Sequence, residues 1–121
     1  GPAIKTIGAR AFAWTKLTNL DLSEATLLVE IGDSAFFRTN LEGTLVIPAK
    51  VTTIGARAFE DTKLTGTLKV GPAVKTIGAC AFLRTKLTGL NLSEATSLVQ
   101  IGGNAFSDTD LEGTIVIPAV T

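Results

Sequence analysis

An internal repeat is the feature that most constrains what this chain can fold into. The heptapeptide TIGARAF occurs at residues 6–12 and again, unchanged, at residues 53–59. Related Ile-Gly segments start at Ile31, Ile77 and Ile101, so that neighbouring copies are 23 or 24 residues apart. A fixed period of about 20–29 residues rich in Leu and Ile is typical of solenoids, whose repeats stack along one axis. We therefore expect residues 1–121 to form a single solenoid segment of about five repeats.

A longer period lies above the first one. The segment GPAIKTIGARAF, which starts at residue 1, returns as GPAVKTIGACAF from residue 71, and LSEATLLVEIG returns as LSEATSLVQIG. Three repeats thus form a larger, duplicated unit, and residue 1 already falls inside the pattern. We expect the sequence to be part of a longer array.

Two apolar columns, two residues apart, predict the strands. The first column contains Leu20, Leu45, Leu68, Leu90 and Ile115, and the second contains Leu22, Ile47, Val70, Leu92 and Ile117. Residues two apart point to the same side of a β-strand. The columns therefore predict about five short strands, stacked in one parallel sheet at a spacing of roughly 4.8 Å.

Three further columns predict how each repeat is closed. A phenylalanine, preceded by an invariant alanine, should form an aromatic stack through the core; this column contains Phe12, Phe36, Phe59, Phe82 and Phe106. A glycine follows each isoleucine and is expected to adopt a positive φ; this column contains Gly8, Gly32, Gly55, Gly78 and Gly102. A threonine, three residues after each phenylalanine, should bond a backbone group in a buried turn; this column contains Thr15, Thr39, Thr62, Thr85 and Thr109.

Taken together, the columns read T-x-L-x-x-(x)-L-x-I/L, followed by I-G-x-x-A-F, and they resemble the BspA-like leucine-rich repeat family over nearly the whole chain. One departure is that many members of the family have Cys in the threonine column. The resemblance implies a curved, right-handed leucine-rich-repeat solenoid, which is classed by convention with the α/β horseshoes but is mostly β and loop. It also implies a surface or extracellular location, a role in protein binding or adhesion, and no catalytic residues.

Composition excludes several functions. The eleven basic residues balance eleven acidic ones, which argues against nucleic acid and against a polybasic membrane patch. No apolar run approaches the roughly 20 residues that a membrane-spanning helix needs. The chain has no His, and its single cysteine, Cys80, cannot form an internal disulfide or a zinc-thiolate site. We therefore expect no enzyme activity, no metal and no cofactor.

Positions that vary between repeats indicate where a partner could bind. The residue between the two strand columns should project from the outer face of the sheet, and this candidate face contains Asp21, Val46, Lys69, Asn91 and Val116. A second candidate is the variable edge after each Ala-Phe pair, which contains Trp14, Phe37, Arg38, Asp61, Arg84 and Asp108. Adjacent edge residues could form a cation–π contact and alternating ion pairs that set the register between repeats, or Trp14 and Phe37 could anchor a partner.

Four functions remain open on these residues. The first is a recognition or adhesion module for an unidentified protein, and the second is a structural spacer that displays other domains. An ice-binding face is suggested by Thr6, Thr53 and Thr76, but Glu30 and Gln100 interrupt that column. A carbohydrate-cleaving solenoid would need clustered carboxylates, whereas the acidic residues here are scattered. In addition, the missing polar caps predict end-to-end self-association.

Overall fold

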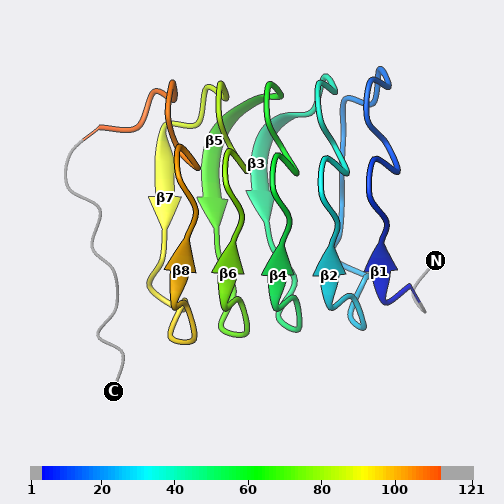
Figure 1. Ribbon diagram of the computed structural model, residues 1–121, viewed down its shortest axis with the longest axis vertical. Helices are drawn as coiled ribbons and strands as arrows, with labels where there is room; N and C mark the ends of the chain where they lie inside the picture. The colour runs from blue at the N-terminus through cyan, green and yellow to red at the C-terminus, as the bar shows by residue number, and fades with distance from the viewer. Residues whose placement is uncertain (1–3, 113–121) are drawn as a thin grey trace.

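The structure, a computed structural model, describes residues 4–112 and consists of eight short strands joined by turns and loops. The strands form a five-stranded sheet in the order β1-β2-β4-β6-β8 and a three-stranded sheet in the order β3-β5-β7 (Figure 1). The first sheet contains β1 (Thr6–Ile7), β2 (Glu30–Ile31), β4 (Thr53–Ile54), β6 (Thr76–Ile77) and β8 (Gln100–Ile101). The second sheet contains β3 (Glu42–Val46), β5 (Lys63–Lys69) and β7 (Gly89–Asn91). All pairings in both sheets are parallel.

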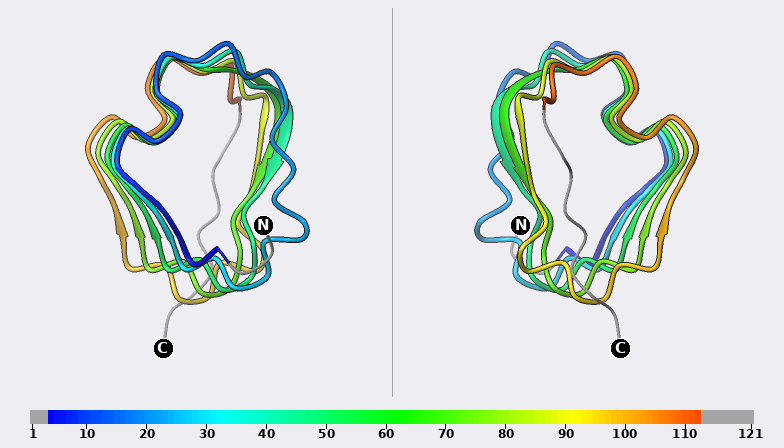
Figure 2. Two further views of the ribbon diagram at one scale, coloured as in Figure 1. Left: turned by 90° about the vertical axis from the view of Figure 1, so that its right-hand side faces the viewer. Right: turned by 90° about the vertical axis from the view of Figure 1, so that its left-hand side faces the viewer.

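Viewed along its axis, the chain is a coil whose two sheets lie on opposite sides of the core (Figure 2). Seen from the N-terminal end, the chain runs along the five-stranded sheet, crosses over, and returns along the three-stranded sheet (Figure 2, left). It turns clockwise as it moves away from the viewer. That sense makes the coil right-handed. The predicted solenoid of stacked repeats with short parallel strands is therefore confirmed.

The five-stranded sheet places identical positions of successive repeats side by side. Its register pairs Ile7 with Ile31, Ile31 with Ile54, Ile54 with Ile77, and Ile77 with Ile101. The isoleucines point into the core, and the residues before them point outward. Each strand is only two residues long. The sequence showed a repeated isoleucine here but did not predict a second sheet, because two residues are too few to show a strand alternation.

The three-stranded sheet contains the first predicted strand column, whereas the second column, with Ile47, Val70 and Leu92, lies directly after the strands. Leu45 pairs with Leu68, and Leu68 with Leu90, as the columns predicted. Leu20 and Leu22 in the first repeat are not in a strand and are only half-buried. Figure 2 shows the reason, since the first repeat bulges outward there and leaves the stack of β3, β5 and β7. The predicted strand positions Ile115 and Ile117 lie outside the described residues.

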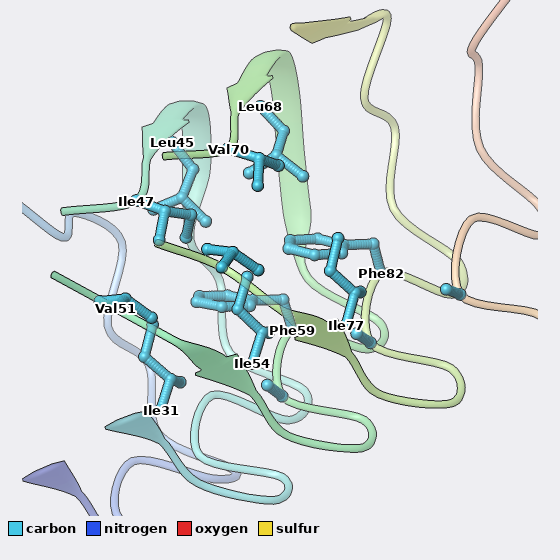
Figure 3. Close-up of a cluster of buried hydrophobic side chains, with 14 of the residues drawn as sticks. Ile31, Leu45, Ile47, Val51, Ile54, Phe59, Leu68, Val70, Ile77 and Phe82 are labelled. Atoms are coloured by element: carbon cyan, nitrogen blue, oxygen red, sulfur yellow. The ribbon is translucent and has the colours of Figure 1, made fainter. Parts of the chain in front are cut away.

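The aromatic stack forms as predicted and is the centre of the core. Neighbouring rings of Phe12, Phe36, Phe59, Phe82 and Phe106 are parallel, with centroids 5.0–5.4 Å apart and interplanar angles of 2–8°. Isoleucines from one sheet and leucines from the other close around these rings (Figure 3). Phe36, Phe59 and Phe82 are fully buried, whereas Phe12, at the β1 end, is 41% exposed. Each ring in the stack thus shields the faces of its neighbours from water.

The prediction that the repeated glycines adopt a positive φ was wrong. Among the described glycines, only Gly43 has a positive φ, of 82°. The reason for glycine in this column is instead close approach, because a Cβ on Gly78 would lie 2.4 Å from the backbone N of Ala56 in the preceding turn. Gly8 has no described turn before it, and nothing lies within 4 Å of its Cβ position. Glycine is therefore required by stacking rather than by local conformation.

The positive φ values occur at two other columns, both occupied by larger residues. The first contains Arg10, Ser34, Arg57, Cys80 and Asn104, and the second contains Trp14, Arg38, Asp61, Arg84 and Asp108. All ten have φ between 54° and 66°, a region that costs L-residues roughly 1 kcal/mol or more. These two bends turn the chain at either side of each Ala-Phe pair.

The threonine column makes the predicted bond in part. The hydroxyls of Thr15 and Thr62 donate to the carbonyls of Phe12 and Phe59 at 2.8 and 3.0 Å. The buried hydroxyls of Thr39 and Thr85 have no hydrogen-bond partner among residues 4–112.

Candidate functional site

The candidate face lies on the outer side of the three-stranded sheet. Val46 ends β3 with its side chain 57% exposed, and Lys69 ends β5 in the neighbouring position. Asn91 pairs with Lys69 and is also exposed. The structure thus brings three of the predicted residues into adjacent turns, while Val116 lies outside the described residues.

A groove of about 750 Å³ opens at this end of the sheet. Its wall on one side is the bulging first repeat, with Asp21 and the half-buried Leu20 and Leu22. The opposite wall is formed by the ends of β3 and β5 and the turns that follow, including Val46 and Pro48. The sequence did not reveal this groove, because it depends on the first repeat leaving the stack.

The groove has an apolar lining with charged groups at its margin. Lys69 Nζ lies 3.3 Å from Glu94 Oε2, so that these two charges are paired. Lys50 and Asp21 also line the groove. An apolar recess with a few charged groups around it is typical of a site that takes side chains of another protein.

Asp21 and Asn91 also stabilise the turn that follows their position. The Ser23 backbone N–H donates to Asp21 Oδ1 at 2.9 Å, and the Ser93 N–H donates to Asn91 Oδ1 at 3.0 Å. The Ser23 hydroxyl, and then the Ser23 N–H, lower the pKa of Asp21 below its ordinary value. The identity of these two residues therefore serves local turn structure as well as the surface.

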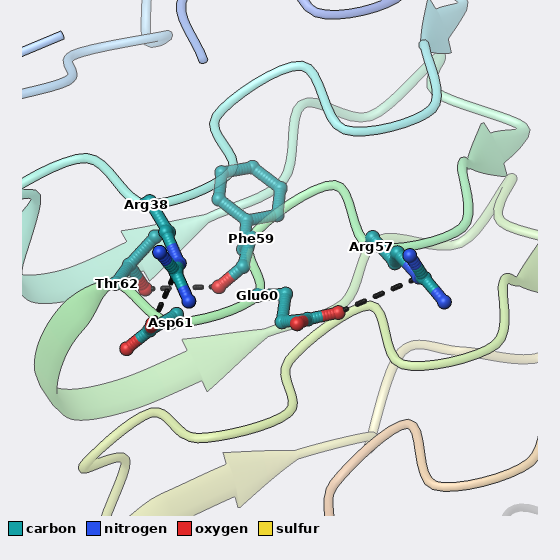
Figure 4. Close-up of polar contacts among 6 residues, drawn as sticks. All are labelled: Arg38, Arg57, Phe59, Glu60, Asp61 and Thr62. Carbon is teal, nitrogen blue, oxygen red and sulfur yellow. Dashed lines mark hydrogen bonds and ion pairs between the residues drawn. The ribbon is translucent and has the colours of Figure 1, made fainter. Parts of the chain in front are cut away.

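The variable edge forms the first part of the predicted ladder. The Trp14 and Phe37 rings meet edge to face at 5.4 Å, and the Arg38 guanidinium lies 4.8 Å from the Trp14 ring centroid. Arg38 Nε also lies 3.2 Å from Asp61 Oδ2, as Figure 4 shows. Trp14 is 66% exposed, so these contacts are at the surface.

The second part of the predicted ladder does not form. No ion pair joins Asp61 to Arg84, or Arg84 to Asp108, in the part of the chain that the structure describes. The Asp61 carboxylate is already held by Arg38 in the preceding turn. The sequence spacing identified this column of side chains, but it could not show with which neighbour each charged side chain would form an ion pair.

A second groove, of about 770 Å³, lies between the edge and the beginnings of β3 and β5. Arg38, Asp61 and Arg84 of the edge line it, together with Glu42, Lys63 and Lys86. Four basic and two acidic side chains therefore face this recess, although the whole chain has no net charge. Lys63 and Lys86 were not predicted as site residues; the only signal in the sequence was their position directly after the threonine column.

No group of three or more Asp, Glu or Cys side chains among residues 4–112 is placed to hold a metal ion. Cys80 is half-buried, at a positive-φ bend. The same span contains no helix that could cross a membrane. The candidate binding features are therefore two grooves, one at each end of the outer face of the three-stranded sheet.

The fold and its surfaces define a β-solenoid repeat protein with a recessed outer sheet face. The family model for the BspA-type leucine-rich repeat region matches residues 4–121, with six copies of the repeat. The chain therefore belongs to the BspA-type leucine-rich repeat family. Members of this family are generally non-enzymatic and generally found at surfaces, and the repeat suggests a module for protein interaction or adhesion. No curated protein and no solved structure significantly matches the chain.

Proposed function

We propose that this chain is a protein-recognition module that binds its partner on the outer face of the three-stranded sheet. The groove beside Val46 is the observation that supports this most directly. This groove combines the exposed apolar side chain of Val46, a wall with half-buried leucines, and the paired charges of Lys69 and Glu94. The surface location of the family fits an adhesion role for such a face.

A matched pair of variants tests this proposal. Val46→Lys places a charge in the groove, whereas Val99→Lys places the same charge just before β8, on the other side of the solenoid, where valine is 72% exposed. The assay is photo-crosslinking of the chain, with the reactive group at position 44, to extracellular protein of its source, followed by competition with each variant. Val99→Lys should compete like the parent chain, and Val46→Lys at least about tenfold less well.

Two outcomes would count against recognition on this face. Equal competition by both variants would mean that the partner binds to a different surface of the chain. No specific crosslink at any concentration would favour the spacer function, in which the repeat only holds other domains apart.

We also propose that the β1 edge can bind a turn from a second copy. Among residues 4–112, β1 has a neighbouring strand on one side only, and Ile4, Phe12 and Trp14 are 45%, 41% and 66% exposed beside it. The space beside Gly8 is open, whereas beside the later glycines of this column the same space is occupied by the backbone of the preceding turn. Light scattering should show concentration-dependent association that Phe12→Lys reduces; a strict monomer at high concentration would refute it.

A further inference from the structure

The groove at the beginnings of β3 and β5 has an arrangement of charge that the solenoid itself does not require. Lys63 and Lys86 occupy the same position in successive turns, because the Lys63 N–H donates to Leu41 O, and the Lys86 N–H donates to Leu64 O, in the same manner. Successive turns are about 4.8 Å apart, and like charges that face each other across that spacing destabilise a sheet. Both lysines are exposed, and neither forms an ion pair within residues 4–112.

Arg84 adds a third unpaired cation to the same recess. The carboxylate one turn before it, Asp61, is engaged by Arg38 at 3.2 Å. Arg84 is exposed and sits at φ 59°, where glycine or asparagine would be less strained. Asp108 follows Arg84 one turn later in the same column, but no ion pair joins the two side chains among residues 4–112. Arg84 is thus a long basic side chain at a strained backbone position, with no ion-pair partner in that span.

We propose that this groove binds an acidic peptide segment of a protein partner, with carboxylates placed among Lys63, Arg84 and Lys86. A bound carboxylate would offset the repulsion between the stacked lysines and give Arg84 the ion-pair partner that residues 4–112 do not provide. Thr39 also lines the groove, and its buried hydroxyl has no hydrogen-bond partner in the described residues. This inference rests on the proposed function, since it names the chemistry of a partner for the same sheet face.

The two acids in the groove favour a peptide over a sulfated glycan or nucleic acid. Glu42 pairs with Lys63 in the strand register, and Asp61 lies between Arg38 and Arg84 along the edge. A polyanion with a charge on every unit would meet these carboxylates and be repelled. A peptide can place its carboxylates beside the lysines and neutral residues beside Glu42 and Asp61.

The test is a titration of the ¹⁵N-labelled 121-residue chain with a synthetic peptide of alternating Glu and Ser, followed by NMR. Binding should shift the amides of residues 39–43 and 62–65 and weaken as salt rises, since exposed charges are screened beyond roughly 10 Å at 0.1 M. The double variant Lys63→Glu/Lys86→Glu should bind at least about tenfold more weakly. Lys75→Glu, an exposed reversal next to β6 on the other sheet, is the matched control and should bind like the parent chain.

Three results would overturn the inference. The first is the absence of saturable shifts with the acidic peptide, and the second is an equal loss in the Lys75→Glu control. The third is tighter binding of a heparin fragment of the same charge than of the peptide, which would make the groove a general polyanion site. Each result leaves the Val46 competition experiment intact, so failure here is distinguishable from failure of the proposed function.

Discussion

The glycine column gives the sharpest prediction, because two glycines with the same sequence context have opposite surroundings. Gly78 and Gly8 both follow Thr-Ile in the five-stranded sheet. At Gly78, an added Cβ would lie 2.4 Å from the Ala56 N and 2.6 Å from the Gly55 carbonyl carbon. At Gly8, it would meet nothing within 4 Å. Gly78→Ala and Gly8→Ala therefore separate the effect of stacking from that of local conformation.

The magnitude at Gly78 follows from the displacement needed. Restoring an ordinary contact of about 3.4 Å moves the two turns apart by about 1 Å, which breaks close-packed contacts. The Gly78 N–H donates to Ile54 O at 2.8 Å, and the Arg57 N–H donates to Ala79 O at 2.9 Å, so both bonds are lengthened beyond useful range. Two such bonds contribute about 1–3 kcal/mol together, and overpacking adds about 1–3 kcal/mol. Gly78→Ala should lower the free energy of unfolding by about 2–6 kcal/mol.

Gly8→Ala should have the opposite sign. Its φ is not positive, and alanine restricts the unfolded chain more than glycine does. The expected gain is about 0.4–1 kcal/mol. Urea unfolding of both variants, followed by far-UV circular dichroism, measures the difference. Equal destabilisation at both positions would refute the stacking explanation and restore a conformational one.

Three further predictions concern the core, the edge and the turn after the first strand column. Phe59→Ala, within the buried stack, should cost about 3–5 kcal/mol in urea unfolding, and Phe12→Ala clearly less, because Phe12 is 41% exposed; equal costs would contradict the stack as the centre of the core. Trp14→Ala should lower stability by about 1–2 kcal/mol through its lost ring and guanidinium contacts, yet leave partner competition unchanged; lost competition with unchanged stability would instead make Trp14 a binding anchor. The hydrogen bonds from Ser23 depress the pKa of Asp21, so the stability from this carboxylate is present above its ordinary pKa and is lost as pH falls through the depressed value; Asp21→Asn, which copies Asn91, should keep the turn and remove that pH dependence, and an NMR titration giving an ordinary Asp21 pKa would contradict this.

The solenoid, its aromatic stack and the exposed strand positions could be predicted because each is a property of one column. When Phe36, Phe59 and Phe82 recur at a fixed period, translation along the axis must superpose them, whatever the detailed path of the chain. The five-stranded sheet was not predictable, since two-residue strands such as β4 carry no periodic signal.

Features that depend on distances between turns also escaped prediction. The role of Gly78 is set by how near the preceding backbone comes, and a sequence column does not record that distance. The choice of Asp61 by Arg38 rather than by Arg84 is a competition between neighbours of equal spacing. The Val46 groove exists because the first repeat leaves the stack, although its LSEAT segment is identical to the one in the fourth turn.

The same stacking that fixes the inner columns leaves the outer sheet face free to vary. An inner residue such as Ile54 or Gly55 is constrained by the turns on both sides, so a substitution there is opposed by packing and by backbone contact together. Val46, Lys63 and Lys86 contact solvent and can change at a cost usually within about 0.5 kcal/mol. Stability therefore places few limits on which side chains occupy the two grooves. The apolar recess at one end of β3 and β5, and the cations without ion pairs among residues 4–112 at the other end, are therefore not dictated by what holds the solenoid together.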